Sequence, residues 1–150
     1  MDSFEFKKVE IFSNFGESKN MVLSSSYQDK VTSRMMSVII FDGEFYFQTD
    51  KNFRKYSQIK NNPNVSLCCD NISVEGVCTE IGKPLDNNEF IKLYKKHYNY
   101  SFQQYSSLNN ERLFKVTPAY IQMWTYKNSK PYIEILDFIS GEYIKTLYKC

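Results

Sequence analysis

The stretch VTSRMMSVIIFDGEFYFQT, residues 31–49, decides the fold, because it contains two strand-like runs joined by a tight turn. The first run is rich in β-branched and apolar residues, and the second is rich in aromatic rings, both of which favour strands. Asp42-Gly43 between such runs is the strongest short-range signal for a β-hairpin. A similar run at residues 20–28 precedes them, so we expect three consecutive antiparallel strands.

Amphipathic patterns lie on either side of this hairpin. Residues 4–15 bring apolar side chains to one helical face, with Asp2 or Ser3 as a cap and Gly16 as a stop, and this helix should cover the end of a sheet. Residues 52–60 predict a helix of one or two turns with Asn52 as its cap. The apolar side chains of this second helix recur at every third position and should face the sheet; they are Phe53, Tyr56 and Ile59.

The remainder of the chain continues the strand-rich pattern. Further strands are expected at residues 64–70, 72–82, 112–126, 131–138 and 142–148, and further helices at residues 86–98 and 102–108. Gly76 lies inside a strand, which usually marks a bulge or a close backbone approach. About seven strands with three or so short helices predict a single mainly β domain over residues 1–150, folded as an antiparallel barrel.

Composition excludes several classes of protein. A net charge of only +2 argues against a dedicated nucleic-acid binder. The chain has no leader-like start and no run of about 18 apolar residues, so we expect a cytoplasmic protein with no membrane partner. Four cysteines without CxxC or metal-type spacing predict reduced, buried thiols; they are Cys68, Cys69, Cys78 and Cys150.

Catalytic motifs are absent from the sequence. It contains no GxSxG, P-loop or GxGxxG pattern, and its acidic residues show no metal-ligand spacing. The one histidine, His97, lies in a Lys-rich helical segment and is expected at the surface. We therefore predict no catalytic side chain and no metal site.

Basic residues near the strand ends are more informative. Arg34 lies inside an apolar strand, where a charge must face solvent, an acid or an anionic ligand. Thr49, Arg54 and Lys55 follow at the end of the next strand and on the helix after it, so all of these side chains could converge on one phosphate. The alternative is that Arg54 and Lys55 merely occupy the solvent-facing side of an amphipathic helix.

The order of these elements resembles the flavin-binding split barrel of the pyridoxamine 5'-phosphate oxidase superfamily. The resemblance covers residues 20–82 closely and the later strands loosely. It is carried by an ordered set of motifs: Arg34, Asp42-Gly43, Phe47-Gln48-Thr49, Arg54-Lys55, Gln58-Ile59, Asn62-Pro63-Asn64-Val65 and Glu75-Gly76. Within the superfamily, the chain most resembles small nitroimidazole-reductase-like and general-stress-protein-like members.

The resemblance implies a homodimer with FMN at the subunit interface. It assigns the phosphate to Arg34, Thr49, Arg54 and Lys55. It places the strand backbone at Met35, Met36 and Ser37, together with Gln48, near the flavin ring, and it suggests that Asn71 comes from the second subunit. Trp124 either stacks near the flavin or fills the barrel, and we favour the second.

The implied function is that of an FMN-dependent oxidoreductase. Reduced flavin would pass electrons to a small, aromatic or nitro-substituted acceptor, and NADH or NADPH would reload it transiently. Vitamin B6 oxidation is disfavoured, because no Arg follows Arg112 in the part of the chain where the oxidase carries a pair. Two alternatives remain: a non-catalytic flavin- or haem-binding module of a stress-response or storage kind, for which His97 would be the haem's imidazole, and a dimer whose site has decayed.

Overall fold

The predicted hairpin is present and has the turn that its sequence requires. In the computed structural model, which describes residues 1–149, strand β2 (Lys30–Phe41) turns into strand β3 (Glu44–Asp50) through Asp42 and Gly43. Both turn residues have positive φ, 52° and 72°, as a two-residue type I′ turn demands. Strand β1 (Ser18–Tyr27) pairs antiparallel with β2 along its whole length, so the three consecutive strands are confirmed.

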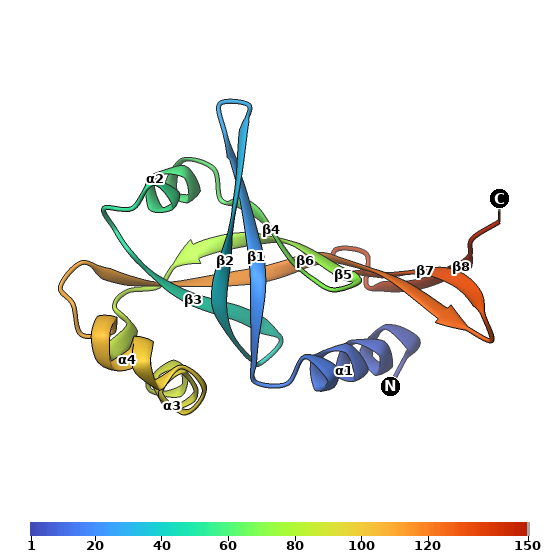
Figure 1. Ribbon diagram of the computed structural model, residues 1–150. Helices are drawn as coiled ribbons and strands as arrows, with labels where there is room; N and C mark the ends of the chain where they lie inside the picture. Colours follow the sequence, from blue (N-terminus) through green and yellow to red (C-terminus); the bar gives the residue numbers. More distant parts are fainter. Residues whose placement is uncertain (150) are drawn as a thin grey trace.

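Six strands close into a barrel. The sheet runs in the order β3-β2-β1-β4-β5-β6-β7-β8, and β3 also pairs with β6, which joins the two ends of the first six strands. The other strands are β4 (Asn64–Cys69), β5 (Ile72–Glu80), β6 (Glu111–Lys127), β7 (Lys130–Asp137) and β8 (Glu142–Leu147). Figure 1 shows β6 crossing the molecule and continuing out of the barrel, where β7 and β8 extend the sheet. The predicted antiparallel split barrel is confirmed, and each strand range expected from the sequence corresponds to one of its eight strands.

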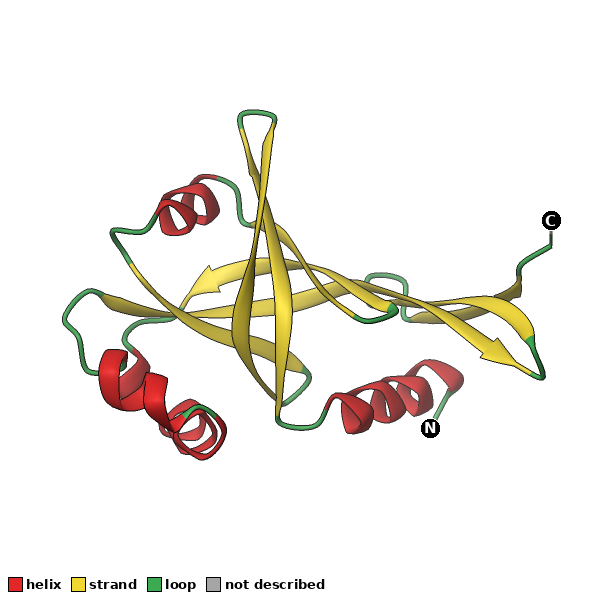
Figure 2. Cartoon of the chain, in the orientation of Figure 1, coloured by secondary structure: helices red, strands yellow, loops and turns green. Residues whose placement is uncertain are grey.

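The helices lie outside the strands (Figure 2). They are α1 (Ser3–Phe15), α2 (Arg54–Asn61), the short 3₁₀ helix η1 (Pro84–Asp86), α3 (Asn88–His97) and α4 (Asn99–Tyr105). Helix α1 is capped at its N-terminus by Asp2, whose carboxylate accepts the N–H of Glu5 at 2.9 Å, and at its C-terminus by Gly16 at φ 72°. It packs beside β7 and β8 in Figure 1, so it covers the extension of the sheet as predicted.

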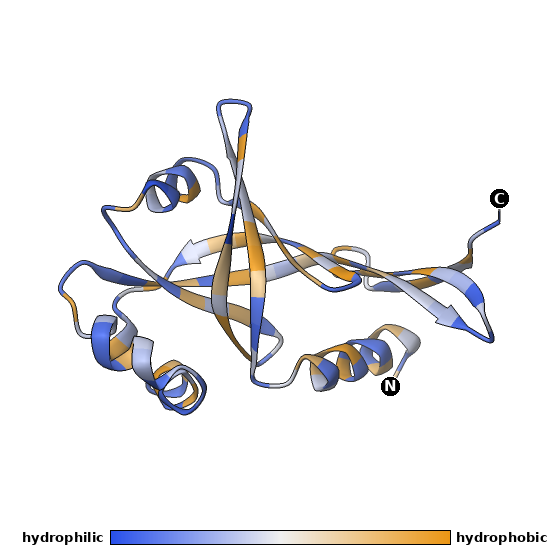
Figure 3. Ribbon diagram, in the orientation of Figure 1, coloured by the Kyte–Doolittle hydropathy of each residue, from blue (hydrophilic) through white to orange (hydrophobic). Residues whose placement is uncertain are grey.

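The core follows from the alternation of side-chain directions along the strands. Figure 3 shows hydrophobic and hydrophilic residues following one another along them. On β3, Phe45 and Phe47 point into the barrel, where they join a core that includes Phe114. Tyr46 points outward and packs in a second cluster beneath α3 with Phe90. The side chains that fill the barrel interior and those that pack beneath α3 therefore lie on opposite faces of β3.

Helix α2 differs from the prediction at its start. It begins at Arg54 with Phe53 as the capping residue, because the Asn52 N–H is bound to the Asp50 carboxylate at 2.8 Å and Asn52 caps nothing. Phe53 is 55% exposed and does not face the sheet. Ile59 is buried as predicted, and half-buried Tyr56 packs against the barrel core, where its ring meets that of Phe114.

Three further expectations meet the structure with different outcomes. Gly76 lies at a bulge in the pairing of β5 with β6, and a Cβ there would stand 2.6 Å from the Thr117 carbonyl oxygen, so the expected close approach is confirmed. Trp124 lies beyond the barrel, where it is 36% exposed and makes an edge contact with Tyr148, so it does not fill the barrel. Within residues 1–149, no helix is long and apolar enough to cross a membrane.

The cysteines are only partly as expected. Cys68, Cys69 and Cys78 are free thiols, and Cys78 is buried, which raises its pKa to about 12. Cys68 is exposed, because adjacent residues of a strand face opposite sides and Cys68 takes the outer one. Cys150 lies outside the described residues.

Candidate functional site

Arg34 lies at one end of the barrel and is held entirely by neutral oxygens. Its Nη1 donates to the Leu23 carbonyl at 3.1 Å and to the Ser25 hydroxyl at 3.0 Å. Its Nη2 donates to Thr32 Oγ1 at 2.6 Å and to Gln58 Oε1 at 3.1 Å. Burial, and then the charge of Arg54, lower the pKa of Arg34. The guanidinium is thus fixed in position with its charge uncompensated by a carboxylate.

The cations of α2, Arg54 and Lys55, lie close enough to Arg34 for their charges to interact with it. Lys55 is half-buried, and its pKa is lowered by burial and then by the charge of Arg34. Its ammonium lies 5.1 Å from the centre of the Phe53 ring, while Arg54 is exposed. Among residues 1–149, Arg34, Arg54 and Lys55 form no ion pair. The structure therefore gathers like charges that disfavour one another, an arrangement that an anion would relieve.

Thr49 supplies a hydroxyl with nothing to bind. The residue is 3% exposed, and its Oγ1 is a buried polar atom without a hydrogen-bond partner in the described chain. A buried hydroxyl without a partner costs about 1–3 kcal/mol, so it usually indicates a ligand or a water. Thr49 and Lys55 line the same cavity of about 350 Å³ at the end of β3. A hydroxyl donor and the ammonium of Lys55 at the same end of β3 are the kinds of group that bind a phosphate.

Gln48 is placed differently from the role that the resemblance implies. Its Nε2 donates to Glu111 Oε2 at 2.9 Å, and its Oε1 accepts from the Ser106 hydroxyl at 2.7 Å. Both ends of the carboxamide are therefore committed to protein partners on β6 and after α4. Its side chain would have only the second Nε2–H and the second lone pair of Oε1 left for a flavin ring.

The residues after Arg34 alternate across β2. Met36 is buried in the barrel core, whereas Met35 is 64% exposed on the outer surface and Ser37 is half-buried. The outer surface of β2 at Met35 and Ser37 is thus open in a single chain. The contact between a flavin ring and this surface of β2 stays a prediction.

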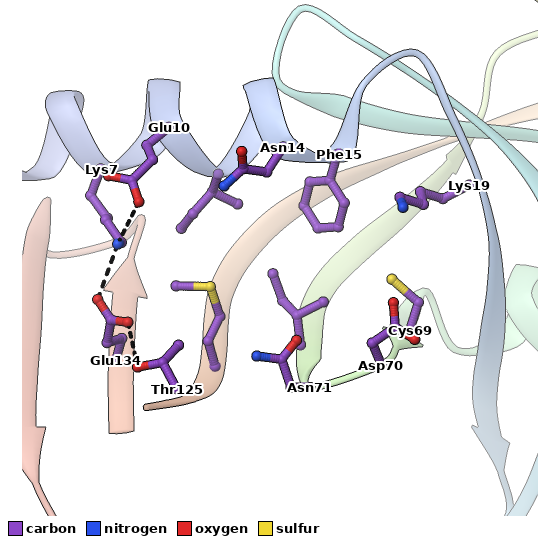
Figure 4. A pocket seen from close by; sticks show the side chains of 13 residues that line it. Lys7, Glu10, Asn14, Phe15, Lys19, Cys69, Asp70, Asn71, Thr125 and Glu134 are labelled. Atoms are coloured by element: carbon purple, nitrogen blue, oxygen red, sulfur yellow. Dashed lines mark hydrogen bonds and ion pairs between the residues drawn. The ribbon is translucent and has the colours of Figure 1, made fainter. Parts of the chain in front are cut away.

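Asn71 is not brought to the phosphate-type site by the fold of one chain. It lies in the turn between β4 and β5, and its Nδ2 donates to the Trp124 carbonyl at 2.7 Å. It lines another cavity of about 280 Å³, whose wall opposite Asn71 is α1 (Figure 4). In this cavity Lys7 bridges Glu10 at 3.0 Å and Glu134 at 3.1 Å. A role for Asn71 at the cofactor requires a second subunit and remains untested.

The structure adds residues that sequence reasoning did not select. Ser25, Thr32 and Gln58 hold Arg34, and Glu111 holds Gln48. Gln58 had a usable signal, because it is a polar residue next to Ile59 on the buried side of an amphipathic helix. Glu111 had none, since before folding it is one acidic residue at the start of a strand.

His97 has a structural partner. Its Nε2 lies 2.9 Å from the Glu17 carboxylate, which also binds Lys96 at 2.9 Å, so the end of α3 is tied to the loop before β1. In residues 1–149 no group of three His, Cys, Asp or Glu side chains could hold a metal ion.

Comparisons with known proteins match the sequence to a family and the fold to solved structures. The family model described as pyridoxamine 5'-phosphate oxidase matches residues 9–125. No curated protein gives a significant match to the chain. Among solved structures, general stress protein 26 from Bacillus anthracis str. Sterne is 27% identical with a TM-score of 0.58, and the match covers 77% of this chain and 89% of that one.

Two further structures share the fold. A pyridoxamine 5'-phosphate oxidase-related, FMN-binding protein from Nostoc punctiforme PCC 73102 is 11% identical with a TM-score of 0.64, and the match covers 100% of this chain and 99% of that one. A NimC/NimA family protein from Clostridium acetobutylicum is 16% identical with a TM-score of 0.54, and the match covers 97% and 94% of the two chains.

Proposed function

The chain belongs to the pyridoxamine 5'-phosphate oxidase family, and from this premise we propose that it is an FMN-dependent oxidoreductase that reduces a small acceptor. The resemblance to nitroimidazole-reductase-like members favours an aromatic or nitro-substituted acceptor. NADH or NADPH would be the transient electron donor. The absence of a catalytic side-chain motif is compatible with this reaction, because a flavin carries the redox chemistry itself.

The observation that carries the proposal is the buried Thr49 hydroxyl at the end of β3, near Lys55 and its neighbouring cations Arg34 and Arg54; within residues 1–149 the hydroxyl has no hydrogen-bond partner and these cations form no ion pair. A phosphate would accept a hydrogen bond from the Thr49 hydroxyl and offset the repulsion between the positive charges of Arg34 and Lys55. Hydrogen bonds to a charged group contribute about 1.5–3 kcal/mol each, so a few such contacts would account for tight binding of the cofactor's phosphate.

The chain's own residues would then position the cofactor. Bound FMN would supply hydride or electron transfer. The four Nη hydrogens of Arg34 already donate to Leu23, Ser25, Thr32 and Gln58, so Arg34 would act on the phosphate through its fixed positive charge and its remaining Nε–H. The exposed outer surface of β2 at Met35 would receive the flavin ring. A homodimer would cover this ring, and Asn71 of the second subunit would complete the site.

Titration of the apoprotein with FMN and with riboflavin tests the proposal. FMN should bind and its fluorescence should change, and the double variant Arg54→Ala, Lys55→Ala should weaken FMN at least about a hundredfold while weakening riboflavin little, since riboflavin lacks the phosphate. Lys60→Gln is the matched control, because Lys60 lies on the same helix but pairs with Glu80 at 3.0 Å. A protein that ignores FMN, or equal losses for both ligands, would refute the assigned site.

Stopped-flow mixing separates a reductase from a binding module. If the proposal is right, NADH or NADPH bleaches the absorbance of bound FMN, and the acceptor restores it. FMN that binds but is not bleached by either donor would instead indicate a non-catalytic flavin-binding protein. A haem-binding role is disfavoured, because the imidazole of His97 is held by Glu17.

A further inference from the structure

Glu111 is a buried carboxyl in the same cavity as Thr49 and Lys55. It is 6% exposed and lies at the start of β6, directly opposite Asp50 in the pairing of β3 with β6. The Gln48 carboxamide donates to its Oε2 at 2.9 Å, and Ser106 fixes that carboxamide from the other side. The carboxyl is therefore held in place and cannot turn away into solvent.

The charges around Glu111 oppose one another. Burial, and then the charge of Asp50, raise the pKa of Glu111 to about 7, while the Gln48 hydrogen bond and the charge of Lys55 hold it lower. Lys55 is the cation that faces this carboxyl, although no direct ion pair joins the two within the described chain. The titratable groups around the carboxyl are Asp50 from β3, Lys55 from α2, Tyr94 from α3 and Tyr105 from α4.

These positions create a conflict when a phosphate binds. Lys55 lines the cavity that also contains Glu111, so a phosphate bound to its ammonium would lie close to this carboxyl. A phosphate monoester carries close to two negative charges at pH 7 and above. The phosphate would pair with Lys55, so that Glu111 loses the attraction of this cation. It would also repel an ionised Glu111, in addition to the repulsion from Asp50. An ionised Glu111 would then be a buried carboxylate facing like charges. Protonation of the carboxyl removes this repulsion at the lowest cost in free energy.

We propose that Glu111 couples FMN binding to the uptake of one proton, so that its carboxyl is ionised in a fraction of the free protein and neutral in the complex. The proton comes from solvent and stays on the carboxyl, which still accepts the Gln48 hydrogen bond through one oxygen. The inference rests on the proposed function, since it concerns the same phosphate site. Its consequence is that a rise in pH drives FMN off the protein.

Calorimetry on the wild-type protein gives the primary test. FMN is titrated at pH 8 in two buffers of different ionisation enthalpy, and the difference in binding heat gives the number of protons taken up. The expected value approaches one for FMN and zero for riboflavin. Between pH 7 and 9, where the phosphate is fully ionised, the Kd for FMN should rise by up to about tenfold per pH unit.

Two variants identify the group that takes up the proton. Glu111→Gln keeps the size and a hydrogen bond to Gln48 but cannot titrate, so its proton uptake should vanish and its Kd for FMN should become flat between pH 7 and 9. Lys55→Arg keeps a positive charge that does not titrate in this range, so its proton uptake should persist. Loss of the uptake in Lys55→Arg would assign the proton to the lysine and overturn the proposal.

The outcomes also separate this inference from the proposed function. Tight FMN binding with no proton uptake in the wild-type protein refutes the coupling and leaves the flavin site standing. No binding of FMN at any pH from 6 to 9 refutes both. A pH dependence of equal size for riboflavin would place the titrating group near the flavin ring, and it would likewise overturn the assignment to Glu111 and the phosphate.

Discussion

Gln58 on α2 accepts a hydrogen bond from Arg34 on β2, with 3.1 Å between Nη2 and Oε1. The same oxygen also accepts from the Ser25 hydroxyl at 3.2 Å and the Thr32 hydroxyl at 2.9 Å. A neutral carboxamide at this point orients the guanidinium without cancelling its charge. The positive charge of Arg34 is thereby kept available for a ligand.

Gln58→Glu tests this interpretation directly. A carboxylate in place of the amide would pair with Arg34, so we expect the apoprotein to keep or gain stability while FMN affinity falls by about 10- to 100-fold, the equivalent of one charge-assisted contact. Riboflavin affinity should change little. Thermal unfolding of the apoprotein and fluorescence titration of both ligands measure the two effects. A variant that binds FMN as tightly as the wild type would show that Arg34 does not serve the phosphate.

Thr49→Val separates a binding role from a structural one. The Thr49 Oγ1 is buried without a hydrogen-bond partner in residues 1–149, so a methyl group of the same shape should leave the free energy of unfolding unchanged or increase it. The affinity for FMN should fall by about tenfold, because one donor to the phosphate is lost. Thr49→Ser, which keeps the hydroxyl, is the control and should retain most of the affinity. A marked loss of stability in Thr49→Val would mean that the hydroxyl has a structural partner.

Local sequence signals predicted most of the barrel. The Asp42-Gly43 pair indicated a turn with positive φ at both residues. The glycine at position 76, inside a strand, indicated a close backbone approach, which the structure shows at Thr117. The same reasoning failed at Phe53, because helical spacing does not reveal that the Asp50 carboxylate binds the Asn52 N–H and delays the start of α2. Trp124 was misplaced because the pairing of β5 with β6 ends at Met123, and the composition of β6 does not show where the strand leaves the barrel.

Sequence patterns select candidate site residues most readily where these are neighbours in the chain. Arg54 and Lys55 are adjacent and follow Thr49 closely, so a pattern could single them out. Gln48 and Glu111 are 63 positions apart, and only the register of β3 with β6 brings their side chains together. The sequence alone therefore did not show that the Gln48 carboxamide has hydrogen-bond partners within the protein. The role suggested for Gln48 at the flavin ring could not be compared with these contacts.

Glu134 on β7 should control stability in acid. Burial alone would raise its pKa, but hydrogen bonds from Thr125, Tyr143 and Lys7 hold that pKa at about 2. A carboxyl with a depressed pKa stabilises the fold above its unfolded value of 4.5, and this stability is lost as pH falls through the folded pKa. Urea unfolding of the wild-type protein should therefore require progressively less urea between pH 5 and pH 2.

Glu134→Gln should remove this stabilisation. We expect a loss of about 1.5–3 kcal/mol at pH 7 and a smaller difference between the variant and the wild type near pH 2. Glu142→Gln is the matched control, because Glu142 is exposed on the neighbouring strand β8. Equal effects of the two substitutions, or a loss in Glu134→Gln that does not shrink in acid, would contradict the assigned role of the buried carboxylate.

Gly76→Ala should destabilise the barrel by contact rather than by backbone conformation. The added Cβ would stand 2.6 Å from the Thr117 carbonyl oxygen and 2.8 Å from Val116 Cγ1, so β5 and β6 must separate at the bulge. Overpacking of this kind costs about 1–3 kcal/mol. Glu75→Ala, at the exposed neighbouring position, is the control and should change the free energy of unfolding by less than about 1 kcal/mol. Chemical denaturation of both variants measures the difference, and a Gly76→Ala protein as stable as the wild type would show that the bulge absorbs a methyl group without strain.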